Sequence, residues 1–189
     1  MGRLAVVYDA CVMYPAPLRS FLMYLAVTDI YRACWTNEIH EEWMNNLIKN
    51  RPDISRQQLE RTRDKMNENV RDCLVTDYEP LIETLRLPDD HDRHVLAAAI
   101  RAKADIILTF NLKDFPPGVL GPYGMEAQHP DQFLCRQFDL FPETVVMAAR
   151  NQRARLKKPA QNVEEYLETL RRQQLPETVL KLRDYSQDL

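Results

Sequence analysis

The sequence predicts an α/β protein whose central sheet is parallel and covered by helices on both faces. Segments that are apolar throughout, such as residues 4–8 and 106–108, are typical of strands buried on both sides. Longer amphipathic segments with helical spacing alternate with them, as in folds where helices connect parallel strands. The four glycines leave residues 3–117 without any, which excludes a Walker A or Rossmann phosphate-binding loop there.

Each element is predicted from the spacing of its apolar residues. Strands are expected at residues 4–8, 32–35, 73–75 and 106–108. Helices are expected at residues 18–27, 37–50, 56–70, 80–85, 93–103, 130–138, 141–154, 163–173 and 176–185. Asn37 is the expected cap of the second helix, and Ser55 with Gln58 has the pattern of a capping box for the third. Residues 116–124 are rich in proline and glycine and are expected to be a loop.

Composition limits the possible partners and the cellular compartment. The 189 residues include 25 Lys and Arg against 28 Asp and Glu, a net charge of −3 that argues against a general role in coating polyanions. The four cysteines are widely spaced without a C-x-x-C motif, so reduced thiols are expected rather than disulfides or a zinc knuckle. No signal peptide or apolar stretch of about 20 residues is present. We therefore expect a soluble cytoplasmic protein that does not enter a membrane.

The charge changes sign near residue 150, which suggests two parts. Residues 150–189 contain 9 basic and 6 acidic residues, whereas residues 1–149 contain 16 and 22. The first domain is therefore expected to cover residues 1–149, and a helical extension residues 150–189. The basic residues between 150 and 158 could contact RNA phosphates or could form a solvated linker. The last two helices are short and need another surface to cover their apolar sides, which could be the body, a second copy or a partner.

Several acidic side chains are expected at one edge of the sheet. Asp9 and Thr109 each follow a predicted strand, and the carboxyl ends of parallel strands share an edge where ligands bind. The side chains that could join them are Glu41 or Glu42, Asp92, Asn111 and Asp114. Carboxylates that converge repel one another unless a cation is present, and oxygen ligands favour Mg²⁺ or Mn²⁺. Such an ion can activate water and bind a phosphodiester.

The pattern of these residues resembles a known family. YDACV at the first strand end, EIHEEW on a helix, DDHDRHVLAAAIRAKADIILTFN and then LKDF are similar to the PIN-domain ribonucleases, and most of all to VapC-like toxins of type II toxin–antitoxin modules. The resemblance extends over about residues 4–135. It implies a three-layer α/β/α domain and an endoribonuclease dependent on Mg²⁺ or Mn²⁺, with RNA as substrate and an antitoxin protein as partner. A homodimer is a separate expectation, since a second copy could cover the apolar sides of the last two helices.

The resemblance also assigns the site residues. The family's acids fall on Asp9, Glu42 and Asp92, and these three with Asn111 are the expected metal ligands. Asn111 stands where the family usually has a fourth acid. Either Asn111 coordinates as a neutral ligand, Asp114 replaces it, or the affinity for the metal is lower. The expected catalytic set is Asp9, Glu42, Asp92, Thr109, Asn111 and Asp114.

The same residues bear on two alternative functions and on a zinc site. A PIN-like binding protein that has lost catalysis would account for Asn111. A phosphatase of similar topology would require an acid at position 11, which is Cys11. Zinc is disfavoured because His91 and His94 lack a third nitrogen or sulfur ligand, and the His40 motif has Met44 where a zinc protease has histidine.

Overall fold

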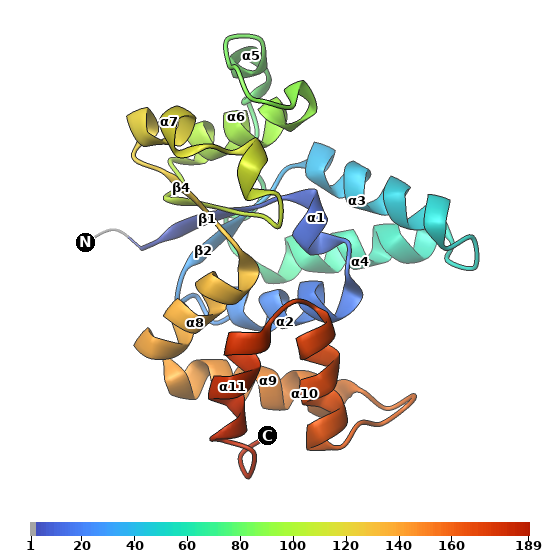
Figure 1. Ribbon diagram of the computed structural model, residues 1–189. Helices are drawn as coiled ribbons and strands as arrows, with labels where there is room; N and C mark the ends of the chain where they lie inside the picture. Colours follow the sequence, from blue (N-terminus) through green and yellow to red (C-terminus); the bar gives the residue numbers. More distant parts are fainter. Residues whose placement is uncertain (1–2) are drawn as a thin grey trace. The chain divides into compact units, whose positions relative to one another are not determined.

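The computed structural model describes residues 3–189 and contains a four-stranded, fully parallel sheet (Figure 1). The strands are β1 (Ala5–Tyr8), β2 (Arg32–Cys34), β3 (Ile106–Leu108) and β4 (Glu126–Gln128), in the spatial order β2-β1-β3-β4. β1 and β3 are central, and Tyr8 is paired with Leu108, so the residues that follow both strands lie side by side. The predicted α/β class and its parallel sheet are confirmed.

One predicted strand is wrong, and one observed strand was not predicted. Residues 73–75 form only a single bridge, between Trp35 and Leu74, because Leu74 is exposed and the segment has no second face to bury. β4 was missed because it follows the proline- and glycine-rich segment and its Glu126 is exposed, so it lacks the apolar pattern of a buried strand. The expected loop also contains the short helix α7 (Pro117–Leu120) and a 3₁₀ turn at Gly121–Tyr123.

The chain divides into two compact units, of which the first contains the sheet. Unit 1 comprises residues 3–14 and 31–129 of the described chain. Besides α7, its helices are α1 (Ala10–Met13), α3 (Asn37–Asn50), α4 (Arg56–Asn69), α5 (Glu79–Ile82) and α6 (Arg93–Ala102). α6 packs against β1 and β3, and α3 packs against α1 and α4. This packing brings the start of α6 and one face of α3 to the carboxyl end of β1.

Helix caps determine where α3 and α4 begin. The cap of α3 is Thr36 rather than the predicted Asn37, because the Thr36 hydroxyl accepts a hydrogen bond of 3.0 Å from the Ile39 N–H. The predicted capping box of α4 is confirmed: Ser55 accepts from the Gln58 N–H, and Gln58 accepts from the Ser55 N–H. These caps satisfy N–H groups that have no partner within the helix.

Unit 2 is helical and comprises residues 15–30 and 130–189. Its helices are α2 (Ala16–Ala26), α8 (Pro130–Leu140), α9 (Pro142–Arg155), α10 (Val163–Arg172) and α11 (Pro176–Arg183). α2 packs against α9, and α8 packs against α11. The predicted helices at the C-terminal end are confirmed. The domain boundary expected between residues 149 and 150 stays a prediction, and α9 crosses it without interruption.

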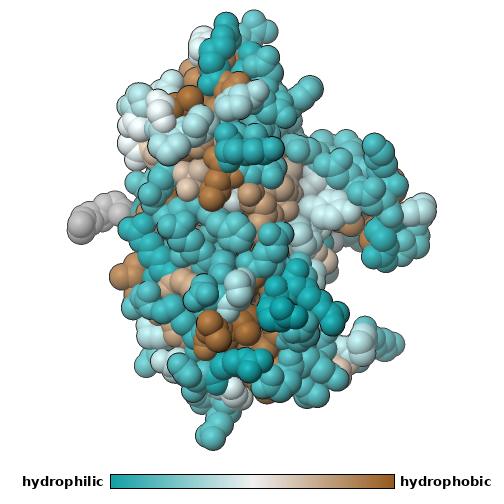
Figure 2. Space-filling view, in the orientation of Figure 1, coloured by the Kyte–Doolittle hydropathy of each residue, from teal (hydrophilic) through white to brown (hydrophobic). Residues whose placement is uncertain are grey.

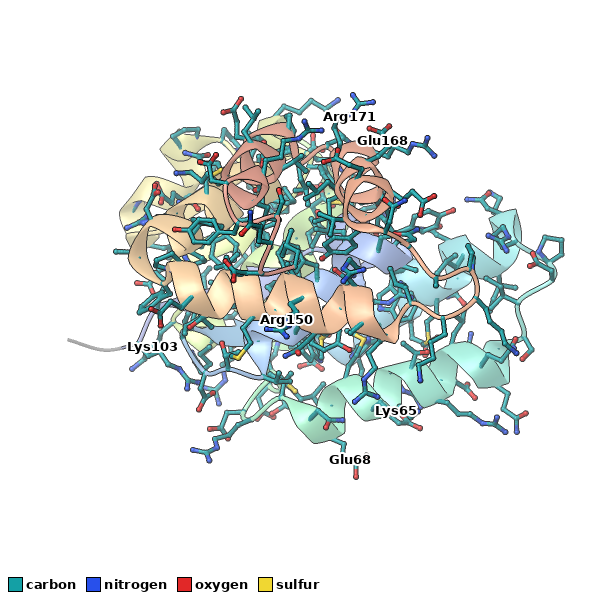
Figure 3. All side chains as sticks on the ribbon, turned by 90° about the horizontal axis from the view of Figure 1, so that it is seen from below. Lys65, Glu68, Lys103, Arg150, Glu168 and Arg171 are labelled. Carbon is teal, nitrogen blue, oxygen red and sulfur yellow. The ribbon has the colours of Figure 1, made fainter. Side chains whose placement is uncertain are left out.

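The face of the molecule that Figure 2 shows is mainly polar, with scattered apolar patches. On the outer face of α10, Glu168 pairs with Arg171 at 2.6 Å and with Arg172 at 3.2 Å (Figure 3). Of the basic residues after 149, Arg153 donates to the carbonyl oxygens of Leu189 and Gln161, so it holds the end of the chain.

All four cysteines are free thiols. Among residues 3–189, the helices are too short or too polar to span a membrane.

Candidate active site

Asp9 is the buried centre of the candidate site. It follows β1 directly, and only 4% of its surface is exposed. The Thr109 hydroxyl donates to Asp9 Oδ2 at 2.7 Å, and the Cys11 thiol donates to the same oxygen at 3.1 Å. Burial raises the pKa of Asp9; these hydrogen bonds oppose the rise, and the nearby charge of Glu42 adds to it. The structure thus fixes one carboxylate at the end of a central strand.

Glu42 and Glu41 lie on different sides of α3. Glu42 Oε2 is 3.3 Å from Nε2 of the buried His94, and its charge acts on Asp9. Glu41 instead pairs with Arg56 and Arg63 of α4. Adjacent residues of a helix point about 100° apart, so only one of the two can face Asp9. The structure places Glu42 there.

Asp92 lies at the junction between a 3₁₀ turn (Asp90–Asp92) and α6. The turn is capped by Asp89, whose Oδ1 accepts from the His91 N–H at 2.9 Å, whereas Asp92 makes no capping hydrogen bond. The Asp92 carboxylate therefore makes no hydrogen bond to the first turn of α6. Burial raises the pKa of Asp92 to about 6, with further contributions from the charges of Asp9, Asp89, Asp114 and Glu42. The charges of the expected acids are thus close enough to act on Asp92.

Asn111 and Asp114 both reach this region from the segment after β3. The Asn111 N–H donates to the Thr109 hydroxyl at 3.0 Å, and its side chain lines a pocket beside Cys11 and Glu42. Asp114 belongs to a 3₁₀ turn (Leu112–Asp114) and contributes to the raised pKa of Asp92. The structure brings both candidates for the fourth position to the site, and the choice between them stays a prediction.

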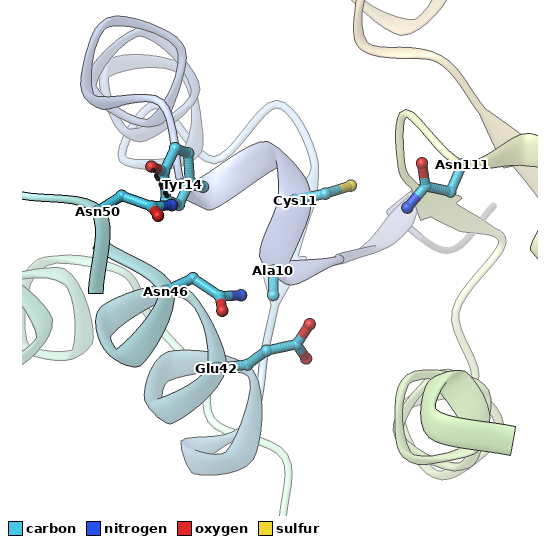
Figure 4. A pocket seen from close by; sticks show the side chains of 7 residues that line it. All are labelled: Ala10, Cys11, Tyr14, Glu42, Asn46, Asn50 and Asn111. Carbon is cyan, nitrogen blue, oxygen red and sulfur yellow. Dashed lines mark hydrogen bonds between the residues drawn. The ribbon is translucent and has the colours of Figure 1, made fainter. Parts of the chain in front are cut away.

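An open pocket of about 360 Å³ adjoins these residues (Figure 4). Its size is within the range of sites for small ligands. The Glu42 carboxylate and the Cys11 thiol point into the space that separates them from Asn111. The lining consists of Ala10, Cys11, Tyr14, Glu42, Asn46, Asn50 and Asn111.

The donor set has the chemistry for a hard divalent cation, although no closed ligand cluster is formed. Within residues 3–189, no three His, Cys, Asp or Glu side chains are grouped closely enough to hold a metal ion by themselves. Mg²⁺ does not require such a cage, since it is commonly bound by one or two carboxylates, waters and substrate phosphates. Burial is the main cause of the raised pKa values of Asp9 and Asp92, and the charges of neighbouring carboxylates add to it. A cation would stabilise the ionised form of both side chains. The residues therefore fit Mg²⁺ or Mn²⁺.

Two residues of the site were not predicted from the sequence. Cys11 was expected to be a core thiol, but its Sγ accepts from the Phe110 N–H at 3.3 Å and donates to Asp9, so it links the ends of β1 and β3. Its position two residues after a strand-end acid was the available signal. His94 was considered only as a zinc ligand. Burial acts to lower its pKa, but Glu42, Glu38 and Asp9 outweigh burial and hold the pKa above the usual value.

His40 is structural. Its Nδ1 accepts from Trp43 Nε1 at 3.0 Å, so Nε2 bears the proton and donates to Asn67 Oδ1 at 3.0 Å. Trp35 donates to the same oxygen at 2.7 Å, which ties α3, α4 and the end of β2 together. The resemblance of this segment to a zinc-protease motif therefore has a packing explanation.

Comparison with known proteins identifies the family. Residues 5–113 match the PIN domain. The chain belongs to the PIN-domain family. A second segment, residues 130–184, matches the VapC50 C-terminal domain. The resemblance to VapC-type PIN proteins is thereby confirmed.

Part of the chain is also similar to a curated protein. Over 52 residues the chain is 58% identical to "Putative ribonuclease VapC50" of Mycobacterium tuberculosis (strain ATCC 25618 / H37Rv). The matched stretch is 28% of this chain and 31% of that protein, so the chain spans about a third of the length of its relative. No solved structure matches the chain.

The raised pKa of Asp92 predicts how pH and metal act on stability. The pKa of Asp92 is about 6 in the folded chain and about 3.9 in an unfolded one. The contribution of Asp92 to folding stability is therefore present below pH 4 and is lost as pH rises through 6. Because Asp92 is half exposed, this loss should not exceed about 1–2 kcal/mol in metal-free protein. Mg²⁺ binds the ionised carboxylates, so its effect on Tm should grow from pH 5 to pH 7. Thermal melts at pH 5, 6 and 7, with Mg²⁺ or with EDTA, measure both effects. Equal stabilisation by Mg²⁺ at pH 5 and pH 7 would contradict the prediction.

Proposed function

We propose that this protein is an endoribonuclease dependent on Mg²⁺ or Mn²⁺ and the toxin of a type II toxin–antitoxin module. The observation that supports this best is the placement of Asp9. It is held by Thr109 at the end of a central strand, within the field of Glu42 and Asp92 and beside an open polar pocket. This is the arrangement expected of a site that places a cation against a phosphodiester.

The proposed roles follow from the positions of the side chains. Asp9, Glu42, Asp92 and Asn111 would hold the cation, with Asp114 as the alternative to Asn111. A bound Mg²⁺ or Mn²⁺ supplies Lewis-acid stabilisation of phosphate oxygens and makes water more acidic. Thr109 keeps Asp9 oriented through the 2.7 Å hydrogen bond, and its hydroxyl also receives the Asn111 N–H. The carboxylates then act from fixed positions, which limits the reorganisation needed during reaction.

The toxin role is supported by the similarity to a VapC-type relative and to the VapC50 C-terminal domain. It implies a cytoplasmic protein whose substrate is RNA and whose inhibitor is a cognate antitoxin protein. A homodimer remains a further prediction. Expression of the chain should arrest growth, and coexpression of the small protein encoded beside it should relieve the arrest. If the chain cleaves RNA but its expression does not affect growth, the toxin role is contradicted and the nuclease activity stands.

A matched pair of adjacent glutamates tests the nuclease. Purified full-length protein should cleave a labelled single-stranded RNA with Mg²⁺ or Mn²⁺ and not with EDTA. Glu42→Gln should reduce the cleavage rate by about 100-fold, because it removes a charge facing Asp9. Glu41→Gln should change the rate less than threefold, because Glu41 faces Arg56. Equal losses would contradict the placement of Glu42 in the site.

The replacement of the family's fourth acid by Asn111 favours one alternative, a PIN-like protein that binds RNA without cleaving it. The same assay separates the two functions. Metal-independent RNA binding without cleavage at any Mg²⁺ or Mn²⁺ concentration would favour the alternative and overturn the proposed nuclease.

A further inference from the structure

One face of α3 forms a polar wall that leads away from the carboxylates. Glu42, Asn46 and Asn50 are spaced four residues apart, so their side chains follow one another along the same face. Each step advances about 6 Å along the helix axis. All three line the pocket, and Tyr14 lies opposite the last of them (Figure 4). We call Tyr14, Asn46 and Asn50 the asparagine wall.

The asparagine wall is neutral, unlike the acidic part of the site. No lysine or arginine is among the residues that line the pocket. A phosphate group would be bound by cations or by convergent N–H groups, so this wall is poorly suited to the RNA backbone. Its side chains instead offer hydrogen-bond donors and acceptors without charge.

The side-chain amides of Asn46 and Asn50 differ in how many of their hydrogen-bonding groups are already used. Asn50 Nδ2 donates to the Tyr14 hydroxyl at 3.0 Å, which fixes the orientation of this amide. Within residues 3–189, the Asn46 side chain makes no hydrogen bond, and Figure 4 shows its amide pointing into the pocket. Asn46 therefore presents both its carbonyl oxygen and its NH₂ group to a ligand.

A nucleobase is the ligand that fits this chemistry. An asparagine amide has a donor and an acceptor side by side, and this pair matches base edges such as N6 and N7 of adenine. Bases of single-stranded RNA are unstacked and available for such pairing and for stacking on aromatic rings, whereas double-stranded RNA hides them. Asn46 lies one helical turn from Glu42, so a base held there would belong to a nucleotide close to the phosphodiester at the carboxylates.

We propose that the asparagine wall is a subsite for one nucleobase of single-stranded RNA, next to the bond that is cleaved. This inference rests on the proposed nuclease function and specifies how the same site selects its substrate. Asn46 reads the base edge, and Tyr14 and Asn50 form the far end of the subsite.

The test combines base changes in the RNA with substitutions in the asparagine wall. Short single-stranded RNAs that differ only in the base at one position beside the cleaved bond are compared with wild-type protein, Asn46→Ala and Asn45→Ala. Asn45 is the matched control, because it is on the same helix but accepts from Arg56. Wild type should prefer one base by roughly five- to 100-fold, the range of a bidentate amide–base pair. Asn46→Ala should reduce this preference at least fivefold, and Asn45→Ala should retain it.

Binding is measured separately from cleavage, by fluorescence anisotropy in EDTA with RNAs that have a 2′-O-methyl group at the cleaved position. Asn46→Ala should weaken the binding of the preferred RNA and leave that of the others unchanged. Unaltered Tm values show that the exposed substitutions keep the fold. If wild type cleaves RNA but Asn46→Ala and Asn50→Ala both keep its base preference, the subsite is wrong and the nuclease stands. If wild type cleaves no RNA with Mg²⁺ or Mn²⁺, the proposed function itself fails.

Discussion

Asp92→Asn is expected to reduce RNA cleavage by at least about 100-fold and at the same time to stabilise the metal-free protein. The carboxylate is half buried among Asp9, Asp89, Asp114 and Glu42, which raises its pKa to about 6. At pH 7.5 it is ionised at a cost in folding free energy, and a neutral amide of the same shape removes that cost. The expected gain is up to about 1 kcal/mol after allowance for solvent exposure. Asp92 makes no capping hydrogen bond to α6, so the amide removes none.

Asp90→Asn is the matched control for this prediction. Asp90 is two residues away and exposed, and its Oδ1 lies 3.4 Å from Nε of Arg93. Its replacement should leave the cleavage rate within about threefold and should not raise stability, since exposed ion pairs contribute little. Initial rates with Mg²⁺ and thermal melts in EDTA measure the two effects. An Asp92→Asn protein that still cleaves RNA, or that is less stable than wild type without metal, would show that Asp92 has another role.

Asp131→Ala is expected to lower the free energy of unfolding by about 2–4 kcal/mol. Asp131 is on α8 and is 7% exposed, yet it caps a different helix. Its two carboxylate oxygens accept from the N–H groups of Glu177 and Thr178, at 3.0 and 2.8 Å, in the first turn of α11. The Thr178 hydroxyl donates to it at 2.6 Å. Alanine would remove the acceptor of the Glu177 and Thr178 N–H groups, and the negative charge at the helix start would be lost.

Asp139→Ala provides the comparison on the same helix. Asp139 is exposed and pairs with Lys181 of α11, so it links the same two helices through a solvated ion pair. Its replacement should have only a small effect. Urea unfolding followed by circular dichroism measures both variants. Similar losses for the two variants would show that the buried cap contributes no more than a surface contact.

Hydrophobic patterning predicted most of the fold because most elements have one apolar side. β1 and β3 are apolar at every position, and α3, α4 and α6 repeat their apolar residues at helical spacing, so each was found within one or two residues. β4 and α7 were not found. Both lie in a segment punctuated by proline and glycine, where local residues predict turns and only the neighbouring β3 makes a strand favourable.

The candidate site was predictable where topology alone fixes position. Asp9 and Thr109 follow adjacent parallel strands, so their meeting could be expected from the order of elements. The choice of Glu42 over Glu41 depends on how α3 is rotated against α1 and α4, which depends on packing rather than on local sequence. His94, Cys11 and Asn46 could not be assigned for a similar reason. Each residue type is common in other settings, and only contacts between distant segments give it a place in the site.

The division of unit 2 between residues 15–30 and 130–189 has a consequence during synthesis. α2 leaves the ribosome early, but α9, which covers it, is made only after residues 31–129. About 130 residues separate the end of α2 from the end of α9, so at about 5–20 residues per second the delay is roughly 6–26 seconds. During that time the α2 side chains that become buried, including Leu18, Phe21, Leu22 and Leu25, have no native cover. The apolar face of α2 therefore stays uncovered until α9 has been translated.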